Sequence, residues 1–212
     1  MGKIKQGILG GFSGTVWTVI GGTWKGITYM RAKAVSTSNP RTEAQQSQRA
    51  KFALVVRFLQ SCTDFIRTGY KNYAIKQTAS NAALSYILAN AVTGSYPDYQ
   101  IDYARVMVSR GALTIPANAQ AGITGGAVRI TWDDNSTSGS AKPSDKALAI
   151  VINPDNGEAV YKTEGATRTG GVETLNIPTD WTGDEVEVYL GFISEDGKEV
   201  SNSVYAGSLT IA

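Results

Sequence analysis

The feature that most constrains the fold is a change of hydrophobic period near residue 101. Beyond it, apolar and polar residues alternate in short runs, which is the period of a strand with one buried face. In the run 185–193, the residues expected on opposite faces are Val186, Val188 and Leu190, and Glu187, Tyr189 and Gly191. Asn-Gly, Gly-Gly and Asp-Gly pairs, typical of turns, close the segments 154–157, 168–171 and 194–197.

Seven runs of this kind have the length of strands. They span residues 105–109, 127–132, 147–153, 159–163, 172–177, 185–193 and 203–211. Short strands at regular spacing are typical of an antiparallel β-sandwich. We therefore expect an α+β protein in which residues 101–212 form a seven-stranded sandwich.

The N-terminal segment predicts a β-hairpin. After a glycine-rich lead-in at 7–14, the β-prone runs 15–20 and 23–31 flank Gly21-Gly22, which we expect to form the turn. Two strands alone are only marginally stable. The hairpin is therefore expected to bury an aromatic-rich face against the helices that follow or against another subunit.

Two helices are predicted between the hairpin and the sandwich. The first covers about 40–68, with Ser38 or Asn39 as cap, Pro40 at its first position and a capping box of Thr42 with Gln45. One apolar stripe on it comprises Phe52, Val55, Leu59, Cys62 and Ile66. The second helix covers 78–90, and 96–99 is expected to be a linker. These assignments divide the chain into domains 1–100 and 101–212.

The two halves carry opposite charge. Residues 1–100 contain 12 Lys and Arg against 3 acidic residues, and residues 101–212 contain 8 against 15, so the net charges are +9 and −7. Such a division is typical of proteins that bind a polyanion or a charged partner. Because an identical chain also supplies the opposite charge, head-to-tail self-association is an equal alternative.

The composition argues against an enzyme. The chain has no His and a single Cys, Cys62, so neither a zinc site nor a Ser-His-Asp triad can be built. The glycine run lacks the Lys of a phosphate-binding loop, and the acidic turns 133–135 and 155–158 lack calcium-loop spacing. We expect no catalytic, cofactor-binding or metal-binding residues and no small-molecule substrate.

The N-terminus lacks the continuous apolar core and cleavage site of a signal peptide. No apolar run approaches the ~20 residues that cross a bilayer. We expect synthesis in the cytoplasm and no membrane partner, with association with a virion or particle left open.

Cationic and aromatic residues interleave in the first half, as suits phosphate neutralisation combined with base stacking, or docking on an acidic protein surface. The candidate residues for assembly or polyanion binding are Trp17, Trp24, Lys25, Tyr29, Arg31, Arg41, Arg49 and Lys51. The alternative is that the aromatic residues belong to the core and the charges to a solvated helix face.

Two resemblances follow from particular residues. Trp132, Tyr189 and the Asp196-Gly197 turn make 104–212 similar to a fibronectin type III or immunoglobulin-like module, which implies display loops or a spacer. The segments 7–14, 24–26, 39–46, 91–99 and 193–199 resemble an uncharacterised family common in Bacteroidetes and their mobile elements, domain of unknown function 6266. That resemblance implies no activity and no site residues.

Together these observations favour a non-enzymatic structural protein, a subunit of a phage-like particle or other ordered homo-oligomeric assembly. Its expected partners are other copies of itself or other subunits. The alternative is a nucleic-acid-binding protein of a mobile element that uses the basic half, and a regulatory binder is a third hypothesis.

Overall fold

The structure is a computed structural model that describes residues 2–4, 10–24, 26–36, 39 and 41–211. It divides into two compact units, Met1–Thr42 and Glu43–Ala212. The boundary between the units thus follows Thr42 in the sequence, whereas a boundary near residue 100 was predicted. The difference arises because the helices after residue 42 share a hydrophobic core with the sandwich.

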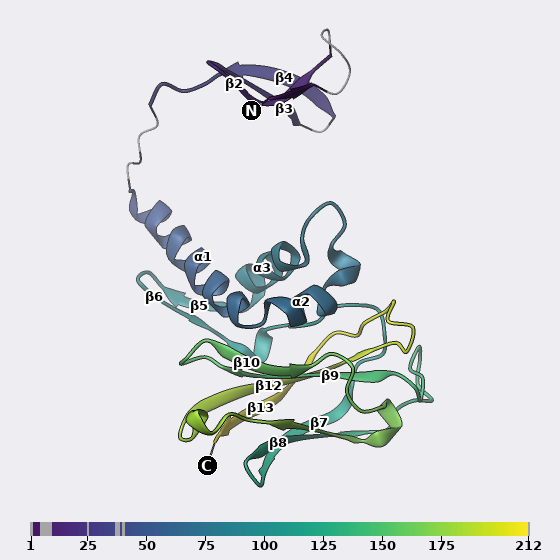
Figure 1. The fold of residues 1–212 in the computed structure, drawn as a ribbon. Helices are drawn as coiled ribbons and strands as arrows, with labels where there is room; N and C mark the ends of the chain where they lie inside the picture. Colours follow the sequence, from purple (N-terminus) through teal and green to yellow (C-terminus); the bar gives the residue numbers. More distant parts are fainter. Residues whose placement is uncertain (1, 5–9, 25, 37–38, 40, 212) are drawn as a thin grey trace. The chain divides into compact units, whose positions relative to one another are not determined.

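The first unit is a small antiparallel sheet with the strand order β1-β2-β3-β4 (Figure 1). Its strands are β1 (Lys3–Ile4), β2 (Phe12–Val16), β3 (Val19–Trp24) and β4 (Ile27–Ala32). The prediction that Gly21-Gly22 forms the turn is wrong, because both glycines lie inside β3. A Cβ on Gly21 would collide with the backbone and ring of Phe12, and one on Gly22 would lie 3.0 Å from the Tyr29 ring. Glycine is needed there for close packing and not for a turn.

The second unit begins with the helices α1 (Glu43–Ser61), α2 (Thr63–Gly69) and α3 (Ala79–Asn90). The single helix predicted over 40–68 is in fact two, because the backbone leaves helical geometry at Cys62 (φ −128°, ψ 26°). Pro40 and Ser38 lie outside the described residues. The second predicted helix is confirmed, with Thr78 as its N-cap: Thr78 Oγ1 accepts a hydrogen bond from the Asn81 amide (3.1 Å).

The segment expected to be a linker is a β-hairpin made of β5 (Val92–Ser95) and β6 (Asp98–Ile101). Two tyrosines tie it to α1. The hydroxyls of Tyr99 and Ser47 lie 2.7 Å apart, and the Tyr96 hydroxyl donates to Gln46 Oε1 (2.9 Å). The hairpin thus belongs to the helical layer.

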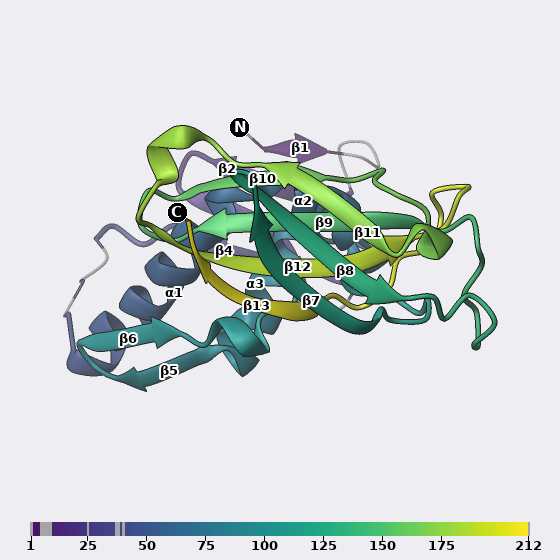
Figure 2. The ribbon, with the colours of Figure 1, turned by 90° about the horizontal axis from the view of Figure 1, so that it is seen from below.

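The sandwich contains seven strands in two antiparallel sheets, ordered β10-β9-β12-β13 and β11-β8-β7. Figure 2 looks onto the three-stranded sheet, with the four-stranded sheet behind it. The strand bounds are β7 (Ala117–Thr124), β8 (Ala127–Asp133), β9 (Lys146–Asn153), β10 (Glu158–Lys162), β11 (Val172–Asn176), β12 (Glu185–Ile193) and β13 (Val204–Thr210).

The predicted number of strands is confirmed, but one assignment is wrong. Arg105 ends a 3₁₀ turn, Tyr103–Arg105, and residues 106–109 form a mostly buried loop, in which the Val108 amide donates to Ser203 Oγ (2.9 Å). The strand that the sequence did not predict is β7, whose first six residues, Ala-Asn-Ala-Gln-Ala-Gly, lack the β-branched and aromatic residues that mark strands.

Two hydrophobic cores meet at the four-stranded sheet. The inner core lies between the two sheets, and it includes Val151 and Val188. The outer core lies between the four-stranded sheet and the helices, and it includes Ile150, Tyr189 and Ile66. Figure 1 shows the helices on that side of the sheet. Strands β9 and β12 are therefore buried on both faces, and the alternation predicted for β12 is confirmed.

The shared outer core gives a test of cooperativity. Ile66→Ala should lower the free energy of unfolding by about 2–5 kcal/mol, because Ile66 is fully buried and its removal leaves a cavity. Helix circular dichroism and the fluorescence of buried Trp132 and Trp181 should still report one common transition. Ile75→Ala is the control, since that side chain is 75% exposed. Two separate transitions would contradict a single core.

Candidate functional site

The N-terminal sheet, defined as strands β1–β4, has no core of its own. Of its described residues only Gly21 is buried. Eight of the fourteen exposed large hydrophobic residues of the described chain belong to the first unit, although that unit is a fifth of the sequence. They are Val16, Trp17, Val19, Trp24, Ile27, Tyr29, Met30 and Val35. An exposed apolar surface this dense is typical of interaction sites.

Strand register assigns the exposed apolar residues to both faces of the sheet. Neighbours paired across two strands share a face, and successive residues alternate. One face, the tyrosine face, carries Tyr29 opposite Gly22 and Trp24 opposite Ile27. The other, the methionine face, carries Met30 opposite Gly21 and Val16 opposite Val19. A sheet with one face packed on a core usually has a polar second face. Both faces of the N-terminal sheet instead carry exposed apolar side chains.

The edge of the sheet is also open. Strand β4 is the last strand of the sheet, and all six of its residues are exposed. It contains one charged residue, Arg31, and no proline. An exposed edge strand of this kind presents a row of backbone groups that can pair with another chain.

The structure brings together only some of the eight candidate residues. Trp24, Tyr29 and Arg31 lie on the N-terminal sheet, and Trp17 stands 88% exposed at the β2–β3 turn. Lys25 lies outside the described residues. Arg41 follows the sheet in the first unit, whereas Arg49 and Lys51 lie on α1 in the second unit. The Lys51 ammonium lies 4.7 Å from the centre of the Tyr99 ring.

The first unit is purely cationic. It contains six Lys and Arg and no Asp or Glu. Within residues 1–100, the first unit thus carries six of the twelve cations and none of the three acidic residues. Positive charge beside exposed aromatic rings suits an acidic protein surface or a polyanion as partner.

The second unit carries a matching feature, which we call the acidic end: Asp155, Glu158, Asp184, Glu185 and Glu187. It lies at the β9–β10 turn and the start of β12. Neutral side chains donate to two of its carboxylates: Asn153 Nδ2 donates to Asp184 Oδ2 (2.7 Å), and Trp181 Nε1 donates to Glu158 Oε2 (3.1 Å). In the described part of the chain, no Lys or Arg forms an ion pair with these five carboxylates.

The uncompensated charge affects the groups around it. Burial, together with the charges of Glu187, Asp155 and Glu185, raises the pKa of Tyr103. Burial also raises the pKa of Glu187, although the Tyr205 hydroxyl donates to its Oε2 (2.7 Å), and the charge of Glu185 adds to the rise. The acidic end therefore carries a negative potential that a cationic partner would relieve.

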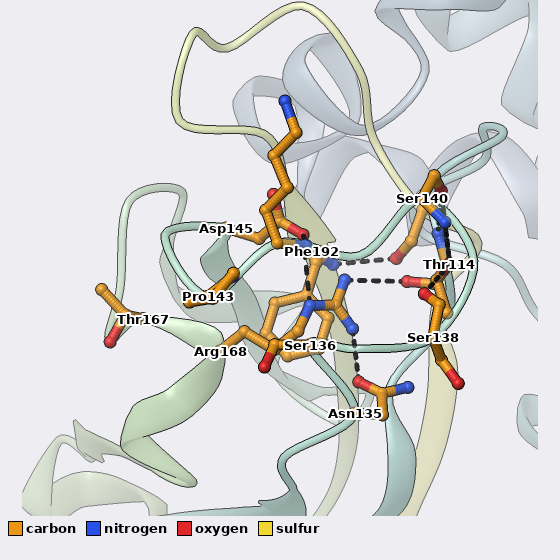
Figure 3. Close-up of polar contacts among 12 residues, drawn as sticks. Thr114, Asn135, Ser136, Ser138, Ser140, Pro143, Asp145, Thr167, Arg168 and Phe192 are labelled. Atoms are coloured by element: carbon orange, nitrogen blue, oxygen red, sulfur yellow. Dashed lines mark hydrogen bonds and ion pairs between the residues drawn. The ribbon is translucent and has the colours of Figure 1, made fainter.

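Sequence reasoning missed a buried ion pair at the opposite end of the sandwich (Figure 3). Arg168 and Asp145 are both fully buried, and Arg168 Nε donates to Asp145 Oδ2 (3.2 Å). The two other guanidinium nitrogens donate to Asn135 Oδ1 (2.6 Å) and the Thr114 carbonyl (2.9 Å). The guanidinium stacks on Phe192 at 3.8 Å. The sequence places Arg168 in a turn, and nothing local predicts its burial.

These contacts of Arg168 join three loops to β12, and their role is structural. The guanidinium nitrogens donate to acceptors within the protein, so the group is not presented to a ligand. Elsewhere, burial raises the pKa of the Cys62 thiol to about 12, which leaves it protonated and unreactive at neutral pH. Among the described residues, no group of three or more His, Cys, Asp or Glu could hold a metal ion.

Comparison with known proteins yields one match. A family model described as a family of unknown function, DUF6266, matches residues 11–207. No curated protein and no solved structure matches the chain. In the described part of the chain, no helix is both long enough and apolar enough to span a bilayer.

The buried ion pair predicts a large effect of a single substitution. Asp145→Ala should lower the free energy of unfolding by about 3–5 kcal/mol, because it leaves the Arg168 guanidinium buried without a counter-charge. Urea unfolding followed by circular dichroism measures it. The exposed Glu195→Ala should change stability by less than about 0.5 kcal/mol. Similar values for both variants would show that the pair is not a structural anchor.

Glu187 predicts a pH dependence. Its pKa is raised in the folded state, so its contribution to stability is present below the ordinary carboxyl pKa and is lost as the pH rises through the folded value. Glu187→Gln keeps an acceptor for Tyr205 without the charge. The variant should therefore be more stable than the native protein at pH 7, with a gain that shrinks as the pH falls through the folded pKa of Glu187 and is lost by about pH 4.5. Melting temperatures across this range test it, and a less stable variant at pH 7 would refute it.

Proposed function

Because the chain belongs to the DUF6266 family, which is of unknown function, its own surfaces must indicate its role, and we propose that it is a non-enzymatic assembly protein. In this proposal the N-terminal sheet joins each copy to other copies. The assembly would be ordered, as in a phage-like particle or another repeating homo-oligomer.

One observation carries the proposal: the N-terminal sheet exposes apolar side chains on both faces. Burying a large apolar side chain contributes about 1.5–3 kcal/mol. Trp24 is 63% exposed and Met30 is 68% exposed, on opposite faces, so most of this stabilisation is left for a partner to supply. A four-stranded sheet without a core needs such cover to be stable.

The second unit has hydrophobic cores of its own, and this difference from the N-terminal sheet supports the proposal. Its two cores are built entirely from residues after position 42. None of the sheet's described residues belongs to either core, so its apolar surface is not explained by the stability of the sandwich. Surface that is costly in water and not needed for the fold is typical of an interface.

A second candidate function, nucleic-acid binding, is favoured by one observation. The first unit combines six cations and no acid with the exposed rings of Trp17, Trp24 and Tyr29. Cations that neutralise phosphates and rings that stack on bases are the two elements of single-strand binding. This function predicts affinity that falls steeply with salt concentration.

Light scattering after size-exclusion chromatography tests the proposed function. The native protein should exceed the 22.5 kDa mass of one chain and grow with concentration. Replacing one residue on each face, Trp24→Ser with Met30→Ser, should shift it to a single chain, because both faces lose apolar contact area. Ile75→Ser, an equally exposed apolar residue in the second unit, should leave the mass unchanged.

A native protein that remains a single chain at high concentration, in both low and high salt, would rule out self-assembly. Loss of the larger species after nuclease treatment would instead favour the nucleic-acid function. Both measurements use the same sample.

A further inference from the structure

The N-terminal sheet could join copies either by pairing with the sheet of another copy or by docking on a different surface of that copy. The distribution of charge distinguishes between these two arrangements. Sheet-to-sheet pairing would bring together two units that each carry six cations and no carboxylate. Juxtaposed like charges oppose association. The helical region, residues 43–100, offers no better partner, since it contains six Lys and Arg against three acidic residues. The complementary surface must therefore be on the sandwich.

The acidic end brings together five carboxylates that form no ion pair with a described Lys or Arg. In the described chain, the carboxylates elsewhere that form ion pairs include Glu164 with Lys146 and Glu173 with Lys162. The acidic end has none of this compensation, and three of its members, Asp155, Glu158 and Glu185, are exposed. A cationic surface docked there would gain electrostatic complementarity without first breaking an ion pair.

A recess adjoins the acidic end. A cavity of about 280 Å³ lies between α1 and the β9–β10 turn, and its lining is mixed. Leu54, Phe58, Ile101 and Tyr103 supply apolar surface, whereas Arg57, Ser61, Asn153 and Asp155 are polar or charged. Asp155 thus belongs to both the recess and the acidic end. The apolar side chains suit an aromatic ring, and the Asp155 carboxylate suits the cationic segment that carries it.

From these features we infer that the N-terminal sheet of one copy docks on the acidic end of a second copy, with Trp17 entering the recess beside Asp155. Trp17 is the most exposed aromatic residue of the described chain, at 88%, and it sits at a turn, where it can project. This inference rests on the proposed function and names the surface that receives the sheet. A head-to-tail contact leaves one free sheet and one free acidic end on every growing assembly, so it propagates into a ring or filament.

A mixing experiment tests the inference on the full-length chain. The sheet variant is Trp17→Ser with Trp24→Ser, which keeps the acidic end. The acid variant is Asp155→Lys with Glu185→Lys, which keeps the sheet. Each alone should run as a single chain, with self-association at least about tenfold weaker than the native protein. An equimolar mixture should give a heterodimer of twice the chain mass and nothing larger, because only one productive contact can form.

The matched control places the same charge change at the far end of β12. Glu195→Lys with Glu199→Lys reverses two exposed carboxylates beyond the end of the strand that Glu185 begins. This variant should assemble like the native protein. Circular dichroism and thermal unfolding establish that every variant is folded. Should the acid variant unfold, the milder Asp155→Asn with Glu185→Gln replaces it, with weaker association as the expected result.

The outcomes separate the inference from the proposed function. If the native protein assembles and the acid variant assembles equally well alone, the sheet docks elsewhere and the inference is wrong, while self-assembly stands. If the control variant loses assembly as fully as the acid variant, the effect is one of net charge, and the inference is again wrong. If the native protein does not assemble, the proposed function itself fails.

Discussion

The structure depends on how each sheet face is covered. In the second unit, β9 and β12 are apolar on both sides, and both sides are covered, by the three-stranded sheet and by the helices. In the N-terminal sheet the strands are again apolar on both sides, yet the side chains are exposed. The hydrophobic effect acts equally on both sheets. In the second unit the apolar surface is buried within the chain, whereas in the N-terminal sheet it is left exposed.

Electrostatic interactions can select which surface would cover the exposed apolar side chains of the N-terminal sheet. Burial of apolar area is not directional, so it cannot by itself select which surface covers the sheet. The charges can, because all six ionisable side chains of the first unit that carry charge at neutral pH are cations, while the carboxylates of the acidic end lack cationic partners among the described residues. Apolar contact would supply most of the affinity, and charge would supply the orientation. This division of roles underlies the head-to-tail arrangement that we propose.

The sequence predictions are accurate where a structure depends on neighbouring residues in the chain, and they fail where it depends on contacts between distant residues. Strands β8 to β13 were predicted because alternation and turn residues are local signals. Strand β7 was missed because its small and polar residues join the sheet through its neighbour β8 and not through their own propensity. Gly21-Gly22 was misread as a turn, since a glycine required for close approach and one required for a turn look alike in sequence. Of the candidate site, the sequence indicated the aromatic and cationic residues of the sheet.

The sequence by itself determined the α+β class, the two-residue period of the sandwich, the opposite charge of the two halves and the lack of histidine chemistry, because composition and local periodicity carry these properties. Only the tertiary structure decided that the helices belong with the sandwich, that Arg168 is buried against Asp145 and that five carboxylates meet at one end. These features join residues far apart in the chain. Their energies depend on which surfaces meet in space, and no local pattern encodes that choice.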